Sequence, residues 1–535
     1  MKEILAADQL GFPLLSALVV LPIAIAILLQ CLRSESAQRQ AAVGGAILEL
    51  ALAVFLVIEF VPGTADIQFV ERMTWMPGLG ASLHFGVDGI SVLFVPLTAL
   101  VFLMTLICSP PAGGRSSGRF YLTCIMLFEA ITMGIFVSLD LLSFFVFWEL
   151  ALLPSYFLVR LWGVGPQRQY AAMKYVMYML VGSAPLLIAI IMLNLNYQDA
   201  VAAGNAVAGQ GFDFLSLMNV PINPENQTLL FFLMLAAFAV KGPVPPFHTW
   251  MPTMLMEGPI GMAIVLVGLK LGTYGMLRFV IPIMPEASYE WSSLMTWLGA
   301  ASVLYGGAIA LVQSNLRRLM AFASVSHVGL MVLGLFSLNM QSVQGSLILM
   351  LHVGLTSTVL MFLVGGLLWR TGSSELSAFG GIARQAPRLA AAFFVMGIAS
   401  IGMPGTSGFL GEFMVLIGSS LRDWRVAAVA VLGVILSAGY FLWYYERAFF
   451  GPPGKNAFKL SDLMPREFAL AAVMIALVFW VGIYPAPFLR ITGASVAALV
   501  EHIERRAVLP TQAGIIEESD VARLEAHSDQ HEEVR

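Results

Sequence analysis

The sequence predicts an all-α polytopic membrane protein with about fourteen transmembrane helices. Hydrophobic residues make up 59% of the 535 residues, charged residues make up only 11%, and the mean hydropathy is +0.85. So few polar side chains cannot cover the surface of a soluble protein of this length. Apolar stretches long enough to cross a hydrocarbon core of ~30 Å recur along most of the chain. The composition therefore indicates a polytopic membrane protein, and the sequence has no basic patch outside its loops that would indicate nucleic-acid binding.

The predicted spans share this apolar composition and are separated by short polar segments. The first is followed by further spans and lacks a small-residue cleavage site, so we expect it to stay in the membrane. The spans are 12–32, 41–61, 89–109, 119–138, 140–160, 172–194, 229–250, 258–281, 293–313, 318–338, 342–367, 388–417, 427–450 and 466–488.

Lysine and arginine placement predicts the orientation of these helices. One set of alternate loops carries most of the basic residues, whereas the other set carries only Arg72, Arg278, Arg422 and Arg425. Because basic loops stay on the cytoplasmic side, the first set is predicted to lie inside. An even number of spans then places both termini outside.

Two helix-breaking sequences suggest an internal repeat. Lys241-Gly242-Pro243 interrupts the seventh predicted span, and Met403-Pro404-Gly405 interrupts the twelfth. The two breaks are five spans apart, and an odd offset reverses one unit relative to the other, as in inverted-repeat transporters. The predicted organisation comprises N-terminal helices 1–3 in 1–110, a first five-helix repeat in 111–285, a second, inverted repeat in 286–452, helix 14 in 453–500, and a charged tail in 501–535.

Ionisable residues inside apolar helices are the candidate functional residues. An unpaired charge at the bilayer centre costs at least ~2.5–3.5 kcal/mol, so a set of them predicts a polar route through the bundle. The set contains Glu129, Glu149, Lys174, Lys241, His248, Lys270, His327, His352 and Glu412. For Glu129, Lys174 and His352, a snorkelling or satisfied core side chain is an equal alternative. Glu149, Lys241 and Glu412 lie deep in their spans or beside a break, which favours function.

These residue types can carry protons. A lysine in a low-dielectric site holds its proton weakly, and a nearby carboxylate restores its affinity, so Glu149 and Lys241 could act as a switchable pair. Lys270 would be the next carrier, His327 an imidazole relay, and Glu412 the terminal acceptor. We expect no catalytic redox residue and no metal site, because three scattered cysteines cannot hold an iron–sulfur cluster or a zinc ion.

Several motifs resemble a known family. Phe85-Gly86-Val87-Asp88-Gly89-Ile90-Ser91, the segment from Asp140 to Leu150 with Trp148-Glu149, Ser324-Val325-Ser326-His327-Val328-Gly329, and Gly402-Met403-Pro404-Gly405-Thr406 followed by Gly408-Phe409-Leu410-Gly411-Glu412-Phe413 occur in register. Over roughly residues 85–490 the chain resembles the subunit M family of NADH-quinone oxidoreductase, respiratory complex I. Related subunits L and N and Mrp-type antiporters usually carry lysine at the position of Glu412.

The resemblance implies a fourteen-helix proton channel in a membrane arm driven by quinone chemistry on other polypeptides. Glu149, Lys241, Lys270, His327 and Glu412 would inherit the proton-transfer roles, with Glu129, Lys174, His248 and His352 as possible relays. This chain would bind no cofactor, whereas FMN, iron–sulfur clusters and quinone would belong to partner subunits. The expected partners are the antiporter-like subunits L and N, small membrane subunits and the lipid bilayer, most simply in a bacterial inner membrane.

Three departures from the family pattern concern the first channel. The segment Met251–Pro259 keeps only the prolines and glutamate of the usual pattern. From Pro259 to Lys270 the chain is about two residues short, which in a regular helix rotates Lys270 by ~200° unless the span begins differently or contains a wide turn. His352 precedes the usual histidine position, now Val353, which predicts a rotation of ~100°.

Three alternative functions remain open from the sequence. An Mrp-type antiporter would exchange sodium for protons without a redox partner. A membrane subunit of a hydrogenase or of an inorganic-carbon uptake complex would use the same residues. A structural spacer would carry an inactive channel.

Overall fold

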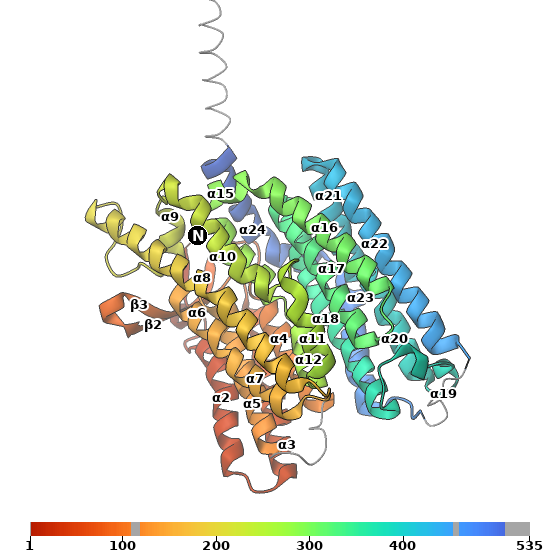
Figure 1. The fold of residues 1–535 in the computed structure, drawn as a ribbon. Coiled ribbons are helices and arrows are strands. Elements are labelled where there is room, and N and C mark those ends of the chain that lie inside the picture. The colour runs from red at the N-terminus through yellow and green to blue at the C-terminus, as the bar shows by residue number, and fades with distance from the viewer. Residues whose placement is uncertain (1, 109–117, 453–459, 509–535) are drawn as a thin grey trace, which may run out of the picture.

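Long apolar helices form the body of the molecule (Figure 1). The computed structural model describes residues 2–108, 118–452 and 460–508. Within these residues, eleven helical segments are long and apolar enough to cross a membrane. They are α2 (Leu14–Cys31), α3 (Glu35–Glu59), α5 (Gly118–Val137), α6 with α7 (Leu141–Leu150, Leu152–Trp162), α8 (Arg168–Ala202), the segment Ile260–Ile283, α16 (Ser292–Leu311), α17 (Leu316–Phe336), α18 (Met340–Thr371), α22 with η5 (Trp424–Tyr445, Glu446–Phe450) and α23 (Pro465–Ile483).

The predicted helical membrane fold is confirmed, and both predicted breaks are present. α10 (Pro224–Lys241) ends at its lysine, and the chain resumes in η2 (Phe247–Thr249) and α11 (Trp250–Glu257). α20 (Pro387–Ser400) and α21 (Ser407–Arg422) are separated in the same way. Proline lacks the N–H that continues a helix. Gly402 and Gly405 take positive φ angles of 72° and 92°, which glycine adopts without steric cost. α4 (Phe94–Cys108) and these broken helices are shorter than a full span, and the count of fourteen stays a prediction.

The segment around Lys270 contains a third break. α12 (Ile260–Gly268) stops before Leu269, whose ψ of 124° is extended, and α13 (Leu271–Gly275) starts after Lys270. A π-helical turn, η3 (Met276–Val280), and α14 (Ile281–Ile283) follow. The span is therefore not a regular helix: the extended residue Leu269 interrupts it before Lys270, and the wide turn comes only after Lys270. Such π turns inside helices are frequent at functional sites.

Arg278 corrects the prediction that it belongs to an outer loop. It lies in η3, is only 1% exposed, and forms an ion pair with Asp88. The loop assignment failed because the wide turn keeps Arg278 inside the bundle rather than beyond its end. Removing Arg278 from the outer loops strengthens the asymmetry of basic residues.

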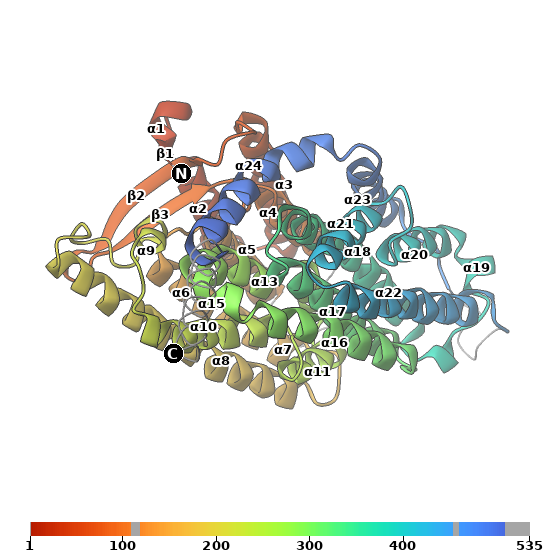
Figure 2. The same cartoon turned by 90° about the horizontal axis from the view of Figure 1, so that it is seen from above.

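A three-stranded sheet lies beside the bundle, and the sequence analysis did not predict it. β1 (Glu3–Leu5) pairs in parallel with β2 (Ile67–Met76), which pairs in antiparallel with β3 (Ala81–Val87) around the short turn η1 (Pro77–Leu79). Figure 2 shows the hairpin extending past the helices near α9 (Phe214–Asn219). The signal that could have found it is the Pro77-Gly78-Leu79-Gly80 turn between two alternating segments.

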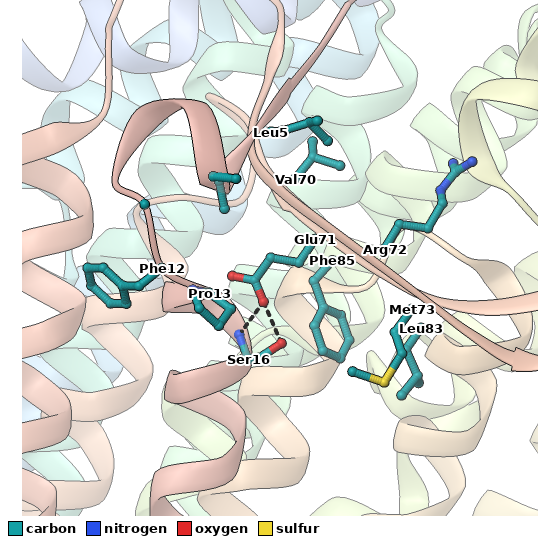
Figure 3. Close-up of a pocket in the computed structure, with 13 residues that line it drawn as sticks. Leu5, Phe12, Pro13, Ser16, Val70, Glu71, Arg72, Met73, Leu83 and Phe85 are labelled. Atoms are coloured by element: carbon teal, nitrogen blue, oxygen red, sulfur yellow. Dashed lines mark hydrogen bonds between the residues drawn. The ribbon is translucent and has the colours of Figure 1, made fainter.

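Glu71 on β2 anchors the first transmembrane helix. Its carboxylate accepts a hydrogen bond from Leu15 N at 2.7 Å. It also accepts hydrogen bonds from Ser16 N at 2.9 Å and from the Ser16 hydroxyl, and Figure 3 shows these two bonds. A carboxylate is a favourable partner for the unsatisfied N–H groups at a helix start. A cavity of about 350 Å³ opens beside it, between the short helix α1 (Ala6–Gln9), α2 and the hairpin. None of the ionisable residues predicted to carry protons lines it.

Short helices complete the chain, and one of them was not predicted. The last predicted span runs to residue 488, whereas α23 ends at Ile483 and α24 (Ala486–Ile503) follows. His502 of α24 lies 3.1 Å from the Pro282 carbonyl. The remaining elements are α15 (Pro285–Glu290), η4 (Leu376–Ala378), α19 (Ile382–Gln385) and η7 (Glu504–Val508). The predicted charged tail lies outside the described residues beyond position 508, and the division into repeats stays a prediction.

Candidate functional site

Lys241 is held at the end of α10 by the residue next to Glu149. Its ammonium donates a hydrogen bond to the Trp148 carbonyl at 3.1 Å and lies 3.8 Å from the centre of the Trp148 indole ring. Glu149 and Lys241 also interact electrostatically, although no ion pair within 4.0 Å joins these two described residues. Cation–π contact and a carbonyl replace part of the hydration of the ammonium. The predicted Glu149–Lys241 pair is therefore adjacent but not in direct contact.

The local sequence fixes where Glu149 lies. Asp140 caps α6 by accepting hydrogen bonds from Leu142 N at 3.0 Å and Ser143 N at 2.9 Å. The cap sets the first turn of the helix, and Glu149 comes in its last turn, just before the interruption between α6 and α7. Glu149 is half-buried in the isolated chain.

Lys270 occupies the break between α12 and α13. Its buried ammonium donates to the Val267 carbonyl and to Ser324 Oγ at 3.0 Å on α17. Gly272 packs against Gly242, so the breaks of α10 and of α12–α13 adjoin, and an added Cβ at Gly272 would lie 2.4 Å from Gly242 Cα. Only glycine permits such a close approach of two backbones.

Two histidines follow on α17 and α18. His327 interacts electrostatically with Lys270, and its Nε2 lies 3.3 Å from the Ser400 carbonyl at the end of α20. His352 interacts electrostatically with His327, and its Nδ1 lies 2.8 Å from Ser407 Oγ at the start of α21. The predicted rotation of His352 therefore does not remove it from the polar residues, because the break before α21 brings Ser407 to the imidazole.

Glu412 lies on the second broken helix and is 6% exposed. The chain reverses tightly in front of it, and a Cβ at Gly402 would lie 2.2 Å from Glu412 Oε2. Glu412 interacts electrostatically with Tyr440 of α22. Tyr440, His327 and Ser400 also line a cavity of about 20 Å³, which is room for about one water molecule.

The structure thus places the predicted residues in one series across the molecule. We call Glu149, Lys241, Lys270, His327, His352 and Glu412 the central line. Glu149 is on α6, and the helices that carry or adjoin the other five residues pack in the order α10, α13, α17, α18 and α21, an order that Figure 2 shows across the bundle. In the described part of the chain, serine hydroxyls, backbone carbonyls and helix breaks lie next to the residues of the central line.

Comparison with known proteins identifies the family. A family model described as NADH:quinone oxidoreductase/Mrp antiporter, TM, matches residues 138–437. NADH-quinone oxidoreductase subunit M of Rhodobacter capsulatus is 36% identical over 504 residues, which cover 91% of this chain and 96% of the relative. The chain belongs to the NADH-quinone oxidoreductase subunit M family. NADH-ubiquinone oxidoreductase chain 4 of Arabidopsis thaliana is 34% identical over 493 residues, covering 91% of this chain and 97% of the relative.

Solved structures agree with this assignment. One chain of respiratory complex I from Thermus thermophilus with bound NADH is 32% identical, covers 91% of this chain and 99% of its own length, and superposes with a TM-score of 0.82. One chain of the Mrp complex from Dietzia sp. is 21% identical, covers 92% of this chain and all of its own length, and has a TM-score of 0.77. At that identity the second likeness is one of fold alone. The protein is thus a multi-pass membrane protein whose structural relatives belong to multi-subunit complexes.

Two further predicted relays of this subunit M family member lie together beside the first break. Lys174 donates to the Thr249 carbonyl at 2.9 Å and to Thr253 Oγ1 at 3.1 Å. His248 interacts electrostatically with Lys174, and its Nε2 lies 3.1 Å from the Tyr305 hydroxyl. Both residues therefore lie next to the start of α11. Glu129 lies elsewhere, on α5, where its electrostatic partner is Glu49.

Sequence reasoning missed four residues that the fold brings to these positions. Ser324 and Ser407 contact Lys270 and His352, Tyr440 interacts electrostatically with Glu412, and Glu49 interacts electrostatically with Glu129. Hydroxyl residues are common in transmembrane helices and carry no sequence signal of their own. Glu49 did carry a signal, because it is an acidic residue inside the predicted span 41–61.

Proposed function

We propose that this chain translocates protons along the central line as a membrane-arm subunit of an NADH:quinone oxidoreductase. The observation that carries the proposal is the coincidence of three helix breaks with three ionisable side chains, the half-buried Lys241 and the buried Lys270 and Glu412. Broken helices next to buried charges are typical of ion sites in transporters, because the freed backbone groups and the cavity replace water. Family membership gives the proposal its redox partner.

The first step would be charge transfer at the Glu149–Lys241 pair. The Trp148 carbonyl and indole ring hold the ammonium while Glu149 supplies the opposite charge nearby. A movement of Glu149, which is half-buried, changes the electrostatic support for the charged lysine. The proton then passes from Lys241 toward Lys270 across the contact between their two helix breaks.

The second half would run from Lys270 to Glu412. Ser324 Oγ accepts a hydrogen bond from Lys270, and His327 lies close enough to interact electrostatically with it. An imidazole has one donor and one acceptor nitrogen when neutral, so it can receive a proton at one and release another at the second. The small cavity shared by His327 and Tyr440 would complete the path to Glu412.

The assembly would supply everything that this chain does not carry. FMN, iron–sulfur clusters and quinone would reside on partner subunits, and this chain would have no independent catalytic activity. The partners would be the antiporter-like subunits L and N and small membrane subunits. The half-buried Glu149 would face such a neighbour or lipid. The most suitable location is a bacterial inner membrane.

Two experiments test the proposal. Isolation of the chain in mild detergent at its native level should recover flavin and iron–sulfur subunits with NADH activity. Recovery with small membrane proteins alone, together with sodium–proton exchange, would instead identify an Mrp-type antiporter, and recovery with a hydrogenase or a carbon-uptake enzyme would identify those complexes.

Substitution then tests the route. In membrane vesicles energised with NADH, Lys241→Ala should abolish the proton translocation that this subunit contributes, whereas Lys2→Ala, at an exposed terminal lysine, should leave it unchanged. Assembled complex that carries Lys241→Ala or Glu149→Ala and pumps normally would favour a structural spacer.

A further inference from the structure

A second set of buried carboxyl groups lies outside the central line. Glu49 on α3 is 1% exposed, and Glu129 on α5 is completely buried. In the described part of the chain, none of their four carboxylate oxygens has a hydrogen-bond partner. The two side chains interact electrostatically with each other, and α3 and α5 are packed together. Two unpartnered acidic side chains therefore share one apolar region.

The two groups lie at the same depth. Arg39 on α3 and Arg119 on α5 each precede the glutamate of their helix by ten residues. At 1.5 Å per residue, both glutamates stand about 15 Å beyond the arginines, which is about half of a ~30 Å hydrocarbon core. Both positions are therefore near the middle of the membrane.

Nearby cations do not neutralise the pair. Arg39 donates to the Ile107 carbonyl at 3.3 Å and Arg119 to the Leu32 carbonyl at 2.9 Å, both toward the end of the helices where the basic loops lie. α2 and α4, which pack against α3 and α5, contain no Asp, Glu, Lys, Arg or His. α6, α7 and β3 also pack against α5 and carry Glu149, Tyr156, Arg160 and His84, but in the described part of the chain none of these forms a hydrogen bond with either glutamate. The other ionisable residues on the two helices are Glu35, Arg39 and Glu59 of α3 and Arg119, Tyr121 and Cys124 of α5.

Physical chemistry then favours a bound proton. A carboxylate without a partner in an apolar region loses its hydration, and this costs several kcal/mol. Two carboxylates that face each other cannot both be ionised without strong repulsion. A protonated carboxyl group removes the charge and offers an O–H that the second carboxyl group can accept.

We propose that Glu49 and Glu129 form a proton-binding pair in the middle of the membrane, separate from the central line. The site lies between α3, which precedes both predicted repeats, and α5, which falls at the start of the first predicted repeat (Figure 1). Its ligand is the proton, held as a neutral carboxylic acid. This gives Glu129 a partner, Glu49, in place of the central line to which the sequence analysis joined it.

Infrared spectroscopy of the purified, assembled complex tests the pair directly. Wild type should show the C=O stretching absorption of protonated carboxylic acids at neutral pH, and the variant E49Q/E129Q should lose part of it. E49Q and E129Q alone should each change the band. Glu225 is exposed at the start of α10, so E225Q is the matched control and should leave the band unchanged.

Superimposable spectra of wild type and E49Q/E129Q in the carboxylic acid region would overturn the proposal, because the pair would then be ionised. Loss of the band on addition of sodium chloride would overturn it in favour of a sodium site. If the double glutamine variant fails to assemble, E49D/E129D keeps both carboxyl groups and should shift the frequency of the band. An unchanged spectrum of that assembled variant would equally contradict a protonated pair.

Discussion

Arg278 and Asp88 form a buried ion pair that joins the π-helical turn η3 to the start of α4. The distance from Arg278 Nη1 to Asp88 Oδ2 is 2.6 Å, and both side chains are almost completely buried. Asp88 also accepts hydrogen bonds from Ile90 N at 3.0 Å and Ser91 N at 3.1 Å. Because Arg278 follows Lys270 by eight residues, this pair fixes the rotation of the segment that carries Lys270.

Removing one partner of this pair should destabilise the protein strongly. Arg278→Leu leaves the Asp88 carboxylate buried without its cation, for which about 3–5 kcal/mol is expected. The double variant Asp88→Leu/Arg278→Leu should recover much of that loss, since it removes both charges. Thermal unfolding of the detergent-solubilised complex measures both, with Arg505→Leu of the exposed Arg505–Glu501 pair as a near-neutral control. Equal stabilities of single and double variants would contradict this account.

Gly402→Ala should impair translocation more than a comparable glycine substitution elsewhere. Gly402 has a φ of 72°, and a Cβ there would meet Glu412 Oε2 at 2.2 Å, so the carboxyl group must move. Gly372→Ala is the control, because its φ is 73° and its Cβ would meet no atom within 4 Å. Both carry a backbone cost of about 1–2 kcal/mol. Proton translocation in energised vesicles should fall for Gly402→Ala alone, and a similar fall for both would reduce the effect to backbone strain.

Tyr440→Phe should slow proton translocation while leaving assembly intact. The change removes only the hydroxyl group of a residue that lines the small cavity with His327 and interacts electrostatically with Glu412, and it keeps the ring. Tyr484→Phe, at a residue that is 59% exposed, is the matched control. The ratio of protons moved to NADH oxidised is the measurement. An unchanged ratio for Tyr440→Phe would exclude the hydroxyl group from the route.

The contact of Asp213 with Arg72 and His84 of the β2–β3 hairpin should be sensitive to acid. Burial opposes its ionisation, but the hydrogen bond and charge of His84 at 2.7 Å, with Arg72 at 3.0 Å, hold the pKa of Asp213 below its ordinary value. A lowered carboxyl pKa stabilises the fold above the ordinary value of about 3.9 and loses that contribution as the pH falls further. Hydrogen exchange in 203–213 should therefore increase below about pH 4.

Asp213→Asn should show the faster exchange already at neutral pH and little further dependence on acid. Asp66→Asn is a useful comparison, because Asp66 also has a lowered pKa, held by the Lys2 backbone N–H and Thr64, but lies on the opposite side of the hairpin. Acid-independent exchange in the wild-type segment would show that the His84–Asp213 contact does not hold it.

The amino-acid sequence determined the features that depend on local composition. Long apolar stretches specify membrane helices because the bilayer requires every backbone group to be satisfied within its own segment. Pro243 and Gly402 to Gly405 specified two of the breaks, since proline and glycine act on the backbone where they stand. The same reasoning selected Lys241, Lys270 and Glu412 from charge and predicted depth alone.

Only the tertiary structure decided which side chains meet. The break at Lys270, the contact of His352 with Ser407, the burial of Arg278 against Asp88 and the approach of Glu49 to Glu129 each join segments distant in sequence. Such contacts depend on helix rotation and packing, and one residue of helix turns a side chain by about 100°. Composition places a charge in the membrane, whereas only the packed helices determine the partner that it faces.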